Sequence, residues 1–293
     1  MTTGRTGAAR RRLAAWIGSW AVVLPFALAI AWLLIGPAAS ILLDSLRDSD
    51  GGATLLNWRD VAASPLTRRA ISASLGIAAA VATISTAVGL PVAWCVGRLA
   101  VGGRSLAAAA LNVAANIPAT SLVFGFAASF GGAGMITLWL RALWPAAPAI
   151  DLYGPTGLIF ILLYLHIPLF VLLILPAMGV VSDELWEAAT LCGAGAGLFW
   201  RRVGLPILAP FVLAGWVLMF VWAIGQYGVP LALGGTDAAI DLITLRIGDL
   251  IQSVGSNNRF GRAACLSLLL ILLSVGALAI YRMLLRRALR WVA

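Results

Sequence analysis

Long apolar runs dominate this chain. Six stretches lack Asp, Glu and Arg, and each is about as long as the roughly 20 residues that a helix needs to cross the hydrocarbon core of a bilayer. Their apolar side chains cover every face instead of alternating with polar ones, which excludes a β-barrel and favours helices. The pattern predicts an all-α, polytopic integral membrane protein with six transmembrane helices: Trp16–Leu43, Ala70–Val96, Leu106–Phe130, Thr156–Val181, Val203–Gly228 and Ala263–Tyr281.

Composition agrees with a membrane protein, and the charges give an orientation. Hydrophobic residues make up 62% of the chain and charged residues 11%, a balance that ordinary soluble domains do not have. All 20 basic residues are arginines, and both ends of the chain are rich in them, so both termini are expected in the cytoplasm. In this topology the cytoplasmic side holds the whole formal net charge of +9. Orientation therefore explains the basic composition, and no nucleic-acid partner is implied.

The predicted helices and loops divide the chain into three parts. Residues 1–68 would form a cytoplasmic tail, the first transmembrane helix and an outer loop, and residues 69–282 a core of five helices. Residues 283–293 would form a basic cytoplasmic tail. The first apolar run is too long for a signal peptide, so it is expected to be retained. Two short helices, Met135–Leu143 and Ile243–Ser253, are expected in outer loops.

The long loop at 182–205 has the pattern of a bent helical element. Asp183 and Glu184 suit the first turn of a helix, where carboxylates complement the helix dipole, and Gly193 suits a left-handed cap at its end. A second helix is expected around Leu198–Val203, with Pro206 at the start of the fifth membrane helix. Such an elbow exposes apolar surface unless a partner covers it, which predicts a docking element. The apolar side chains expected on it are Trp186, Leu191, Phe199 and Trp200.

Within this loop the chain resembles the permease subunits of type I ABC importers. The family signature is Glu-Ala-Ala, three residues, Gly, and a spacer that ends in Leu-Pro; here it is Glu187-Ala188-Ala189, Gly193 and Leu205-Pro206, with Pro210 following. The resemblance extends over about Arg69–Tyr281. It includes Gly89-Leu90-Pro91-Val92-Ala93 and Leu233-Gly234-Gly235. The longer segment Gly225–Gly235 looks closer to the polyamine, iron(III), thiamine and phosphonate branch than to the sugar branch, whose members tend to carry an Asn- and Thr-containing motif there.

The resemblance implies partners and a location. The elbow would be a coupling helix that lies in a groove of a cytoplasmic ATPase subunit, with Glu187 in polar contact there and Gly193 setting the bend. Two copies of the ATPase subunit, a second permease subunit (a paralogue or another copy of this chain) and an extracytoplasmic solute-binding protein would complete the importer. The chain would lie in the bacterial inner membrane as half of the pathway for a small, charged solute, and it would bind no cofactor.

Three alternatives compete with this interpretation. A solvated loop that matches the motif by chance is the simplest. A secondary, ion-coupled transporter usually carries ionisable groups inside the membrane, whereas the six predicted helices contain none except His166. An intramembrane enzyme is disfavoured because the sequence lacks a cluster of His, Cys and carboxylates with metal-ligand spacing.

The chain has no lysine, so it cannot provide the phosphate-binding lysine of a P-loop, and ATP hydrolysis is expected from another polypeptide.

Polar residues in the predicted helices are candidates for the solute pathway. Gln226 and Tyr227 follow the apolar run of the fifth helix and would meet a solute near the outer half of the membrane. Alternatively, Tyr227 lies at the membrane boundary and Gln226 bonds another helix. His166 precedes Ile167-Pro168, so its ring could line the pathway or bond a backbone carbonyl freed by the proline.

Overall fold

The computed structural model describes residues 4–48, 51–145, 151–234, 240–253 and 258–289. The described residues are almost entirely helical, and the pairing of extended chain among them is one isolated bridge between Arg47 and Ala53. The elements are α1 (Gly4–Ser45), α2 (Leu56–Ala63), α3 (Pro65–Gly97), α4 (Val101–Ala115), α5 (Ala119–Phe130), α6 (Met135–Leu143), α7 (Pro155–Met178), α8 (Asp183–Leu191), α9 (Ala196–Phe199), a π-helical turn (Trp200–Gly204), α10 (Leu205–Ile224), α11 (Gly228–Ala232), α12 (Ile243–Gln252) and α13 (Arg259–Leu289).

Six helical segments of the described chain are long and apolar enough to cross a membrane, which confirms the predicted class and number. These segments are Val23–Ser45, Pro65–Gly97, Ala119–Leu143, Pro155–Met178, Ala196–Ala232 and Arg259–Arg286. Five of them overlap the predicted helices along most of their length. The predicted short helices also occur, as α6 and α12, at nearly the expected bounds.

The third predicted helix, Leu106–Phe130, is wrong as a continuous element. The chain breaks between α4 and α5, where the Asn116 amide donates to the Asn112 carbonyl and side-chain oxygens at 2.8 Å each. Pro118 follows and has no N–H to continue the helical ladder. The candidate membrane segment is instead α5 together with α6, Ala119–Leu143, so α6 is part of a candidate segment and not separate from it. Hydropathy missed this break because the apolar run continues through it.

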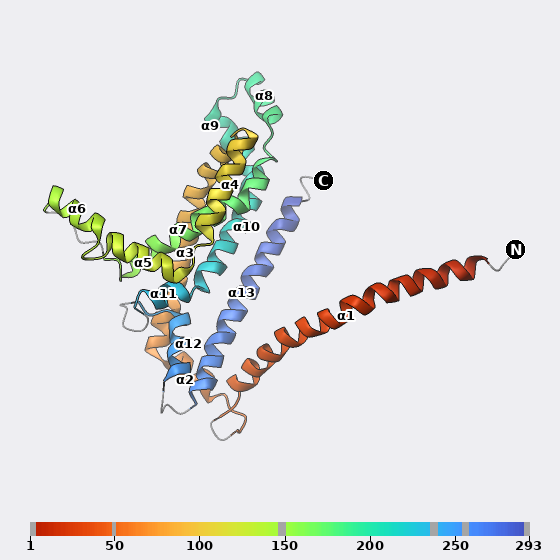
Figure 1. The fold of residues 1–293 in the computed structure, drawn as a ribbon, viewed down its shortest axis with the longest axis vertical. Coiled ribbons are helices and arrows are strands. Elements are labelled where there is room, and N and C mark those ends of the chain that lie inside the picture. Colours follow the sequence, from red (N-terminus) through yellow and green to blue (C-terminus); the bar gives the residue numbers. More distant parts are fainter. Residues whose placement is uncertain (1–3, 49–50, 146–150, 235–239, 254–257, 290–293) are drawn as a thin grey trace.

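The centre of the fold is a bundle of α3, α7 and α10, with α13 packed along α10 (Figure 1). Phe170 on α7 lies at the meeting point of the three helices and is fully buried. Its ring fits because glycines face it: a Cβ on Gly89 of α3 would lie 2.6 Å from Phe170 Cδ1, and one on Gly215 of α10 would lie 2.8 Å from Cε2. Two glycines thus allow three helices to approach closely around one large ring.

Helix α1 leaves this bundle as an arm that contacts α13 near its own C-terminal end (Figure 1). In the described part of α1, no residue of the most apolar 18-residue stretch is buried against the rest of the protein. The loop after α1 is held to α13 by Asn258, whose amide donates to the Arg47 carbonyl at 3.0 Å and to Asn57 Oδ1 at 2.6 Å. An ion pair between Arg262 and Asp60, at 2.7 Å, adds to this connection.

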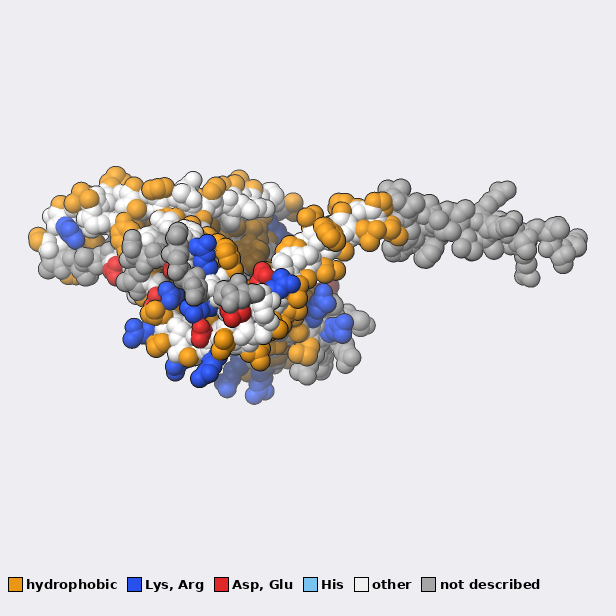
Figure 2. Space-filling view, turned by 90° about the horizontal axis from the view of Figure 1, so that it is seen from below, with side chains coloured by type: hydrophobic (Ala, Val, Ile, Leu, Met, Phe, Trp, Pro, Cys, Tyr) orange, Lys and Arg blue, Asp and Glu red, His pale blue; other side chains and the backbone are white. Residues whose placement is uncertain are grey.

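Charged side chains mark the end of the bundle opposite α8. Seen from that end, arginine and carboxylate side chains gather over the near face, while hydrophobic side chains cover the flanks and the part of α1 next to the bundle (Figure 2). An apolar belt between polar ends is the distribution that a bilayer requires.

Candidate functional site

The segment that carries the sequence motif forms an elbow between α7 and α10, at the top of the bundle in Figure 1. Asp183 and Glu184 lie in the first turn of α8, as predicted. The helix ends at Leu191, and Gly193 follows in the left-handed region with φ +78°. Its N–H donates to the Thr190 carbonyl, and the Ala194 N–H donates to the Ala189 carbonyl, both at 2.9 Å. These two bonds form a Schellman cap, which fixes the direction in which the chain leaves α8.

The second arm of the elbow leads into the membrane helix. After α9, the π-helical turn Trp200–Gly204 runs directly into α10, and Pro206 lies in the first turn of α10, where its missing N–H is not needed. Gly204 is buried under the Trp200 ring, since a Cβ on it would lie 2.6 Å from Cε3. The expected helix around Leu198–Val203 is therefore present as a short α-helix followed by a π-helical turn.

Four aromatic rings join the elbow to α3, and we call them the aromatic chain: Trp186, Phe199, Trp200 and Trp94. The ring centroids of Trp186 and Phe199 are 4.9 Å apart, those of Phe199 and Trp200 5.9 Å, and those of Trp200 and Trp94 4.5 Å, all edge to face. Edge-to-face pairs of this kind contribute about 0.5–1.5 kcal/mol each beyond the burial of area. The aromatic chain thus connects α8, α9 and the π-helical turn to α3.

This packing covers most of the apolar surface that the sequence predicts on the elbow, so part of the cover comes from the chain itself. Phe199 is 1% exposed, and Trp186 and Trp200 are half-buried in the aromatic chain. Leu191, at the end of α8, is 89% exposed. The surface left for a partner is therefore smaller than predicted and is concentrated on α8.

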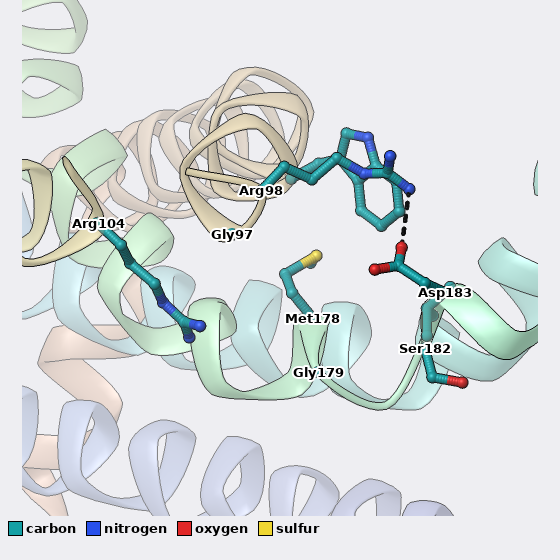
Figure 3. Close-up of a pocket in the computed structure, with 9 residues that line it drawn as sticks. Gly97, Arg98, Arg104, Met178, Gly179, Ser182 and Asp183 are labelled. Atoms are coloured by element: carbon teal, nitrogen blue, oxygen red, sulfur yellow. Dashed lines mark ion pairs between the residues drawn. The ribbon is translucent and has the colours of Figure 1, made fainter. Parts of the chain in front are cut away.

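Arg98, at the end of α3, adds a polar contact to the same junction. Its guanidinium lies 4.3 Å from the centroid of the Trp94 ring and forms an ion pair with Asp183 of α8 at 3.5 Å (Figure 3). The pair is exposed, so it contributes at most about 1 kcal/mol. It borders a cavity of about 550 Å³, and Arg104 of α4 lies on the opposite side of that cavity (Figure 3). Trp94 and Arg98 were not predicted as part of the site; their i, i+4 spacing indicates that the two side chains meet on one helix, but not that they meet the elbow.

The motif residues divide into an outward and an inward face of α8. Glu187 and Ala188 are exposed, and within the described chain the Glu187 carboxylate has no ion pair. Ala189 faces inward, half-buried, and its carbonyl oxygen is one of the two acceptors in the cap. Leu205 and Pro206, at the other end of the motif, are exposed at the start of α10. The outward face thus offers a free carboxylate beside exposed apolar surface.

The pathway candidates lie far from the elbow. Gln226 and Tyr227 occupy a break between α10 and α11. His166 is 1% exposed inside the bundle, and its Nδ1 lies 2.8 Å from the Leu162 carbonyl oxygen. Pro168 frees the carbonyl of Tyr164, four residues earlier, so the ring does not bond the carbonyl that the proline leaves free. No group of three or more His, Cys, Asp or Glu that could hold a metal occurs among the described residues.

A polytopic helical bundle with a capped elbow projecting from one end has the architecture of an importer permease. The family model described as "Binding-protein-dependent transport system inner membrane component" matches residues 84–290. The chain belongs to this family. It is a multi-pass inner membrane protein and a permease subunit of an ABC importer, not a catalytic enzyme, and the ion-coupled alternative finds no support.

Individual relatives agree on the class. A protein named as a probable sulfate transport system permease in Nephroselmis olivacea is 28% identical over 80% of this chain and 78% of its own length. The molybdenum transport system permease protein of Mycobacterium bovis is 26% identical over 72% of this chain and 77% of its own. Among solved structures, a chain of a bacterial ABC transporter for the acidic polysaccharide alginate has 15% sequence identity and a TM-score of 0.71, over 98% of this chain and 99% of that one.

Proposed function

We propose that this chain forms half of the translocation pathway for a small, charged solute that an extracytoplasmic binding protein delivers. ATP would be hydrolysed by a separate subunit, present in two copies, and a second permease subunit would supply the other half of the pathway. The absence of lysine from the sequence supports this division of labour, since a P-loop requires one. A solved relative of the fold is described in complex with a periplasmic protein that carries an alginate pentasaccharide, which supports the delivery step.

The orientation follows from the elbow. If α8 meets a cytoplasmic ATPase, both termini lie in the cytoplasm, and the charged end formed by α2 and α12 faces outward. Residues 69–282 would then be the transporting core, with residues 1–68 as an addition and 283–293 as a basic tail. The family match over residues 84–290 and the exposed arm of α1 support this division.

The observation that carries the coupling role is the outward face of α8. It presents Glu187 without an internal partner next to Leu191, on a helix whose exit is fixed by Gly193. A groove in the ATPase subunit that covers Leu191 and pairs with Glu187 would hold this helix. Its displacement would pass along the aromatic chain and the Arg98–Asp183 pair to α3, and along the covalent chain to α7 and α10.

The pathway is proposed to pass the break between α10 and α11. Helical backbone is interrupted there at Gln226 and Tyr227, inside the candidate membrane segment Ala196–Ala232. Non-helical backbone is tolerated at membrane depth where it is buried in protein or lines a water-filled cavity. We assign His166 to packing of the bundle in this conformation because its side chain is enclosed.

The coupling role is tested by Glu187→Arg in the complete importer. We expect the variant permease to insert into the membrane and fold, but to lose co-purification with the ATPase subunit and solute uptake into proteoliposomes. Arg69→Glu is the control, because Arg69 is equally exposed but lies at the opposite end of the bundle. Wild-type uptake by Glu187→Arg, or equal losses in both variants, would refute the docking of α8.

A further inference from the structure

The break between α10 and α11 lies beside a second cavity, of about 620 Å³. Tyr227 and Leu231 line it from the α11 side, and Leu245, Asp249, Gln252 and Ser253 line it from α12 and the residue after it. Three of these side chains carry polar groups without a hydrogen bond or ion pair within the described chain: the Tyr227 hydroxyl, the Asp249 carboxylate and the Gln252 amide. The cavity therefore combines one carboxylate, one aromatic ring and one amide.

Helix α12 is fixed in place relative to the break. The Thr244 hydroxyl donates to the Gln226 carbonyl at 2.9 Å and so satisfies a backbone acceptor of the interrupted helix. At the start of α12, the Ile243 N–H donates to the buried Ser74 hydroxyl of α3 at 2.9 Å. These two bonds attach α12, which forms one side of the cavity, to α3 and to the break between α10 and α11.

The ring of Tyr227 also has a defined place. It lies against Gly248 on α12, where a Cβ would come within 2.8 Å of the Tyr227 hydroxyl oxygen. Any other residue at position 248 would push the ring away from this wall. Gly248 therefore lets the Tyr227 ring lie against α12 at the cavity, next to Asp249 in the sequence.

One formally charged side chain among the described residues lines the cavity, and it is a carboxylate. Asp249 is the charged residue that lines it, while Arg246 and Asp241, the groups that act on this carboxylate through their charge, do not line it. Partial burial raises the pKa of the Asp249 carboxyl and Arg246 on the same helix opposes the shift, so the ionised form would gain from a further cation nearby. An aromatic face beside the carboxylate adds cation–π attraction, and the Gln252 carbonyl adds an acceptor for an N–H donor. A sulfate-like anion would be repelled by the Asp249 carboxylate.

We propose that this cavity is a subsite of the solute pathway that accepts a positively charged organic group, an amine or a guanidinium. Asp249 binds the charge, the Tyr227 ring covers it and Gln252 accepts a hydrogen bond from it. This inference rests on the proposed pathway at the α10–α11 break, and it assigns the solute to a different charge class from the sulfate and molybdate of the named relatives.

The test uses charged thiol reagents on the assembled importer in lipid nanodiscs. Cys95, Cys192 and Cys265 are first replaced by Ala, and Gln252→Cys or, as a second position, Ser253→Cys is introduced. Because a thiolate is itself an anion, a trimethylammonium methanethiosulfonate reacts faster than a sulfonate methanethiosulfonate at any site, so the charge preference of the cavity is the excess of this rate ratio at the cavity thiol over the ratio at a control thiol. We expect that excess to be about fivefold or more. Adding Asp249→Asn should abolish the preference, and tetraethylammonium, but not sulfate, should slow the reaction. Ile251→Cys, at an exposed position that does not line the cavity, is the control.

Four outcomes of this test would overturn the proposal: equal rates for the two reagents, a preference that survives Asp249→Asn, the same rate ratio at Ile251→Cys, or protection by sulfate. The test does not depend on ATPase coupling. A separate measurement, with ATP and vanadate to trap the closed importer, examines the pathway itself. A charge preference without a change in rate on trapping would mean a cation site outside the pathway, and that result would reject the solute subsite while leaving the coupling role of α8 intact.

Discussion

The indole rings of Trp94 and Trp200 meet edge to face, with centroids 4.5 Å apart and an angle of 83° between the planes. Trp94 belongs to α3, and Trp200 opens the π-helical turn that leads from the elbow into α10. This pair is the point at which the aromatic chain leaves the elbow and reaches the bundle. It is a contact through which a displacement of α8 can act on a membrane helix that is distant in sequence.

We therefore expect Trp94→Ala to weaken coupling more than folding. The substitution leaves Trp186, Phe199 and Trp200 in place, so the elbow keeps its own packing, but it removes the contact with α3 and the support under Arg98. Because an aromatic pair contributes about 0.5–1.5 kcal/mol, the solute transported per ATP hydrolysed should fall roughly twofold to tenfold while ATPase activity persists. Parallel uptake and ATPase assays measure the ratio, with the exposed Trp139→Ala on α6 as control. An unchanged ratio in Trp94→Ala would contradict the aromatic connection.

The elbow shows how far the sequence could predict the site. The start and the end of α8 could be predicted from local signals. Asp183 and Glu184 complement the helix dipole in the first turn, and Gly193 adopts the left-handed conformation of the cap. The aromatic chain depends on Trp94, which meets the elbow only through the tertiary packing of α3, so periodicity could not place it. For the same reason hydropathy found six apolar segments but missed the break at Asn116–Pro118, which changes backbone geometry without changing polarity.

The left-handed conformation of Gly193 gives a matched test of the elbow. Gly193→Ala should destabilise the cap by about 1–2 kcal/mol, because its φ of +78° strains any residue with a Cβ, although the space around it is open. Gly197→Ala is the control, since Gly197 also has open space but lies within α9 at ordinary helical geometry. Hydrogen exchange of the amides of α8 should accelerate in the first variant and stay the same or slow in the second. Equal exchange in the two would show that the cap does not hold α8.

The close approach of α3, α7 and α10 around Phe170 predicts a strong effect of one methyl group. Gly89→Ala should lower stability by about 1–3 kcal/mol, because the new Cβ overlaps the ring, whereas Gly76→Ala on the same helix meets open space and should be neutral or stabilising. Thermal unfolding of the purified chain in detergent compares the two. Phe170→Leu should recover part of the loss when combined with Gly89→Ala, and a double-mutant cycle gives the coupling energy. Simple additivity would mean that the ring and the glycine act independently.

The raised pKa of Asp249 predicts a stability that depends on pH. Desolvation is the main cause; Arg246 opposes it and Asp241 adds to it. Because the folded pKa exceeds the ordinary value of 3.8, the folded chain binds this proton more tightly than the unfolded chain. This contribution to the free energy of unfolding is present below that ordinary value and is lost as the pH rises through the folded pKa.

Asp249→Asn removes the penalty of ionisation, so its unfolding temperature relative to the parent chain should be higher at about pH 7.5 than at about pH 3.5. In Asp241→Asn, desolvation of Asp249 remains, and most of the pH dependence of the parent should persist. The opposite order of the two temperature differences in Asp249→Asn would show that a cationic group on the protein stabilises the carboxylate more than burial destabilises it.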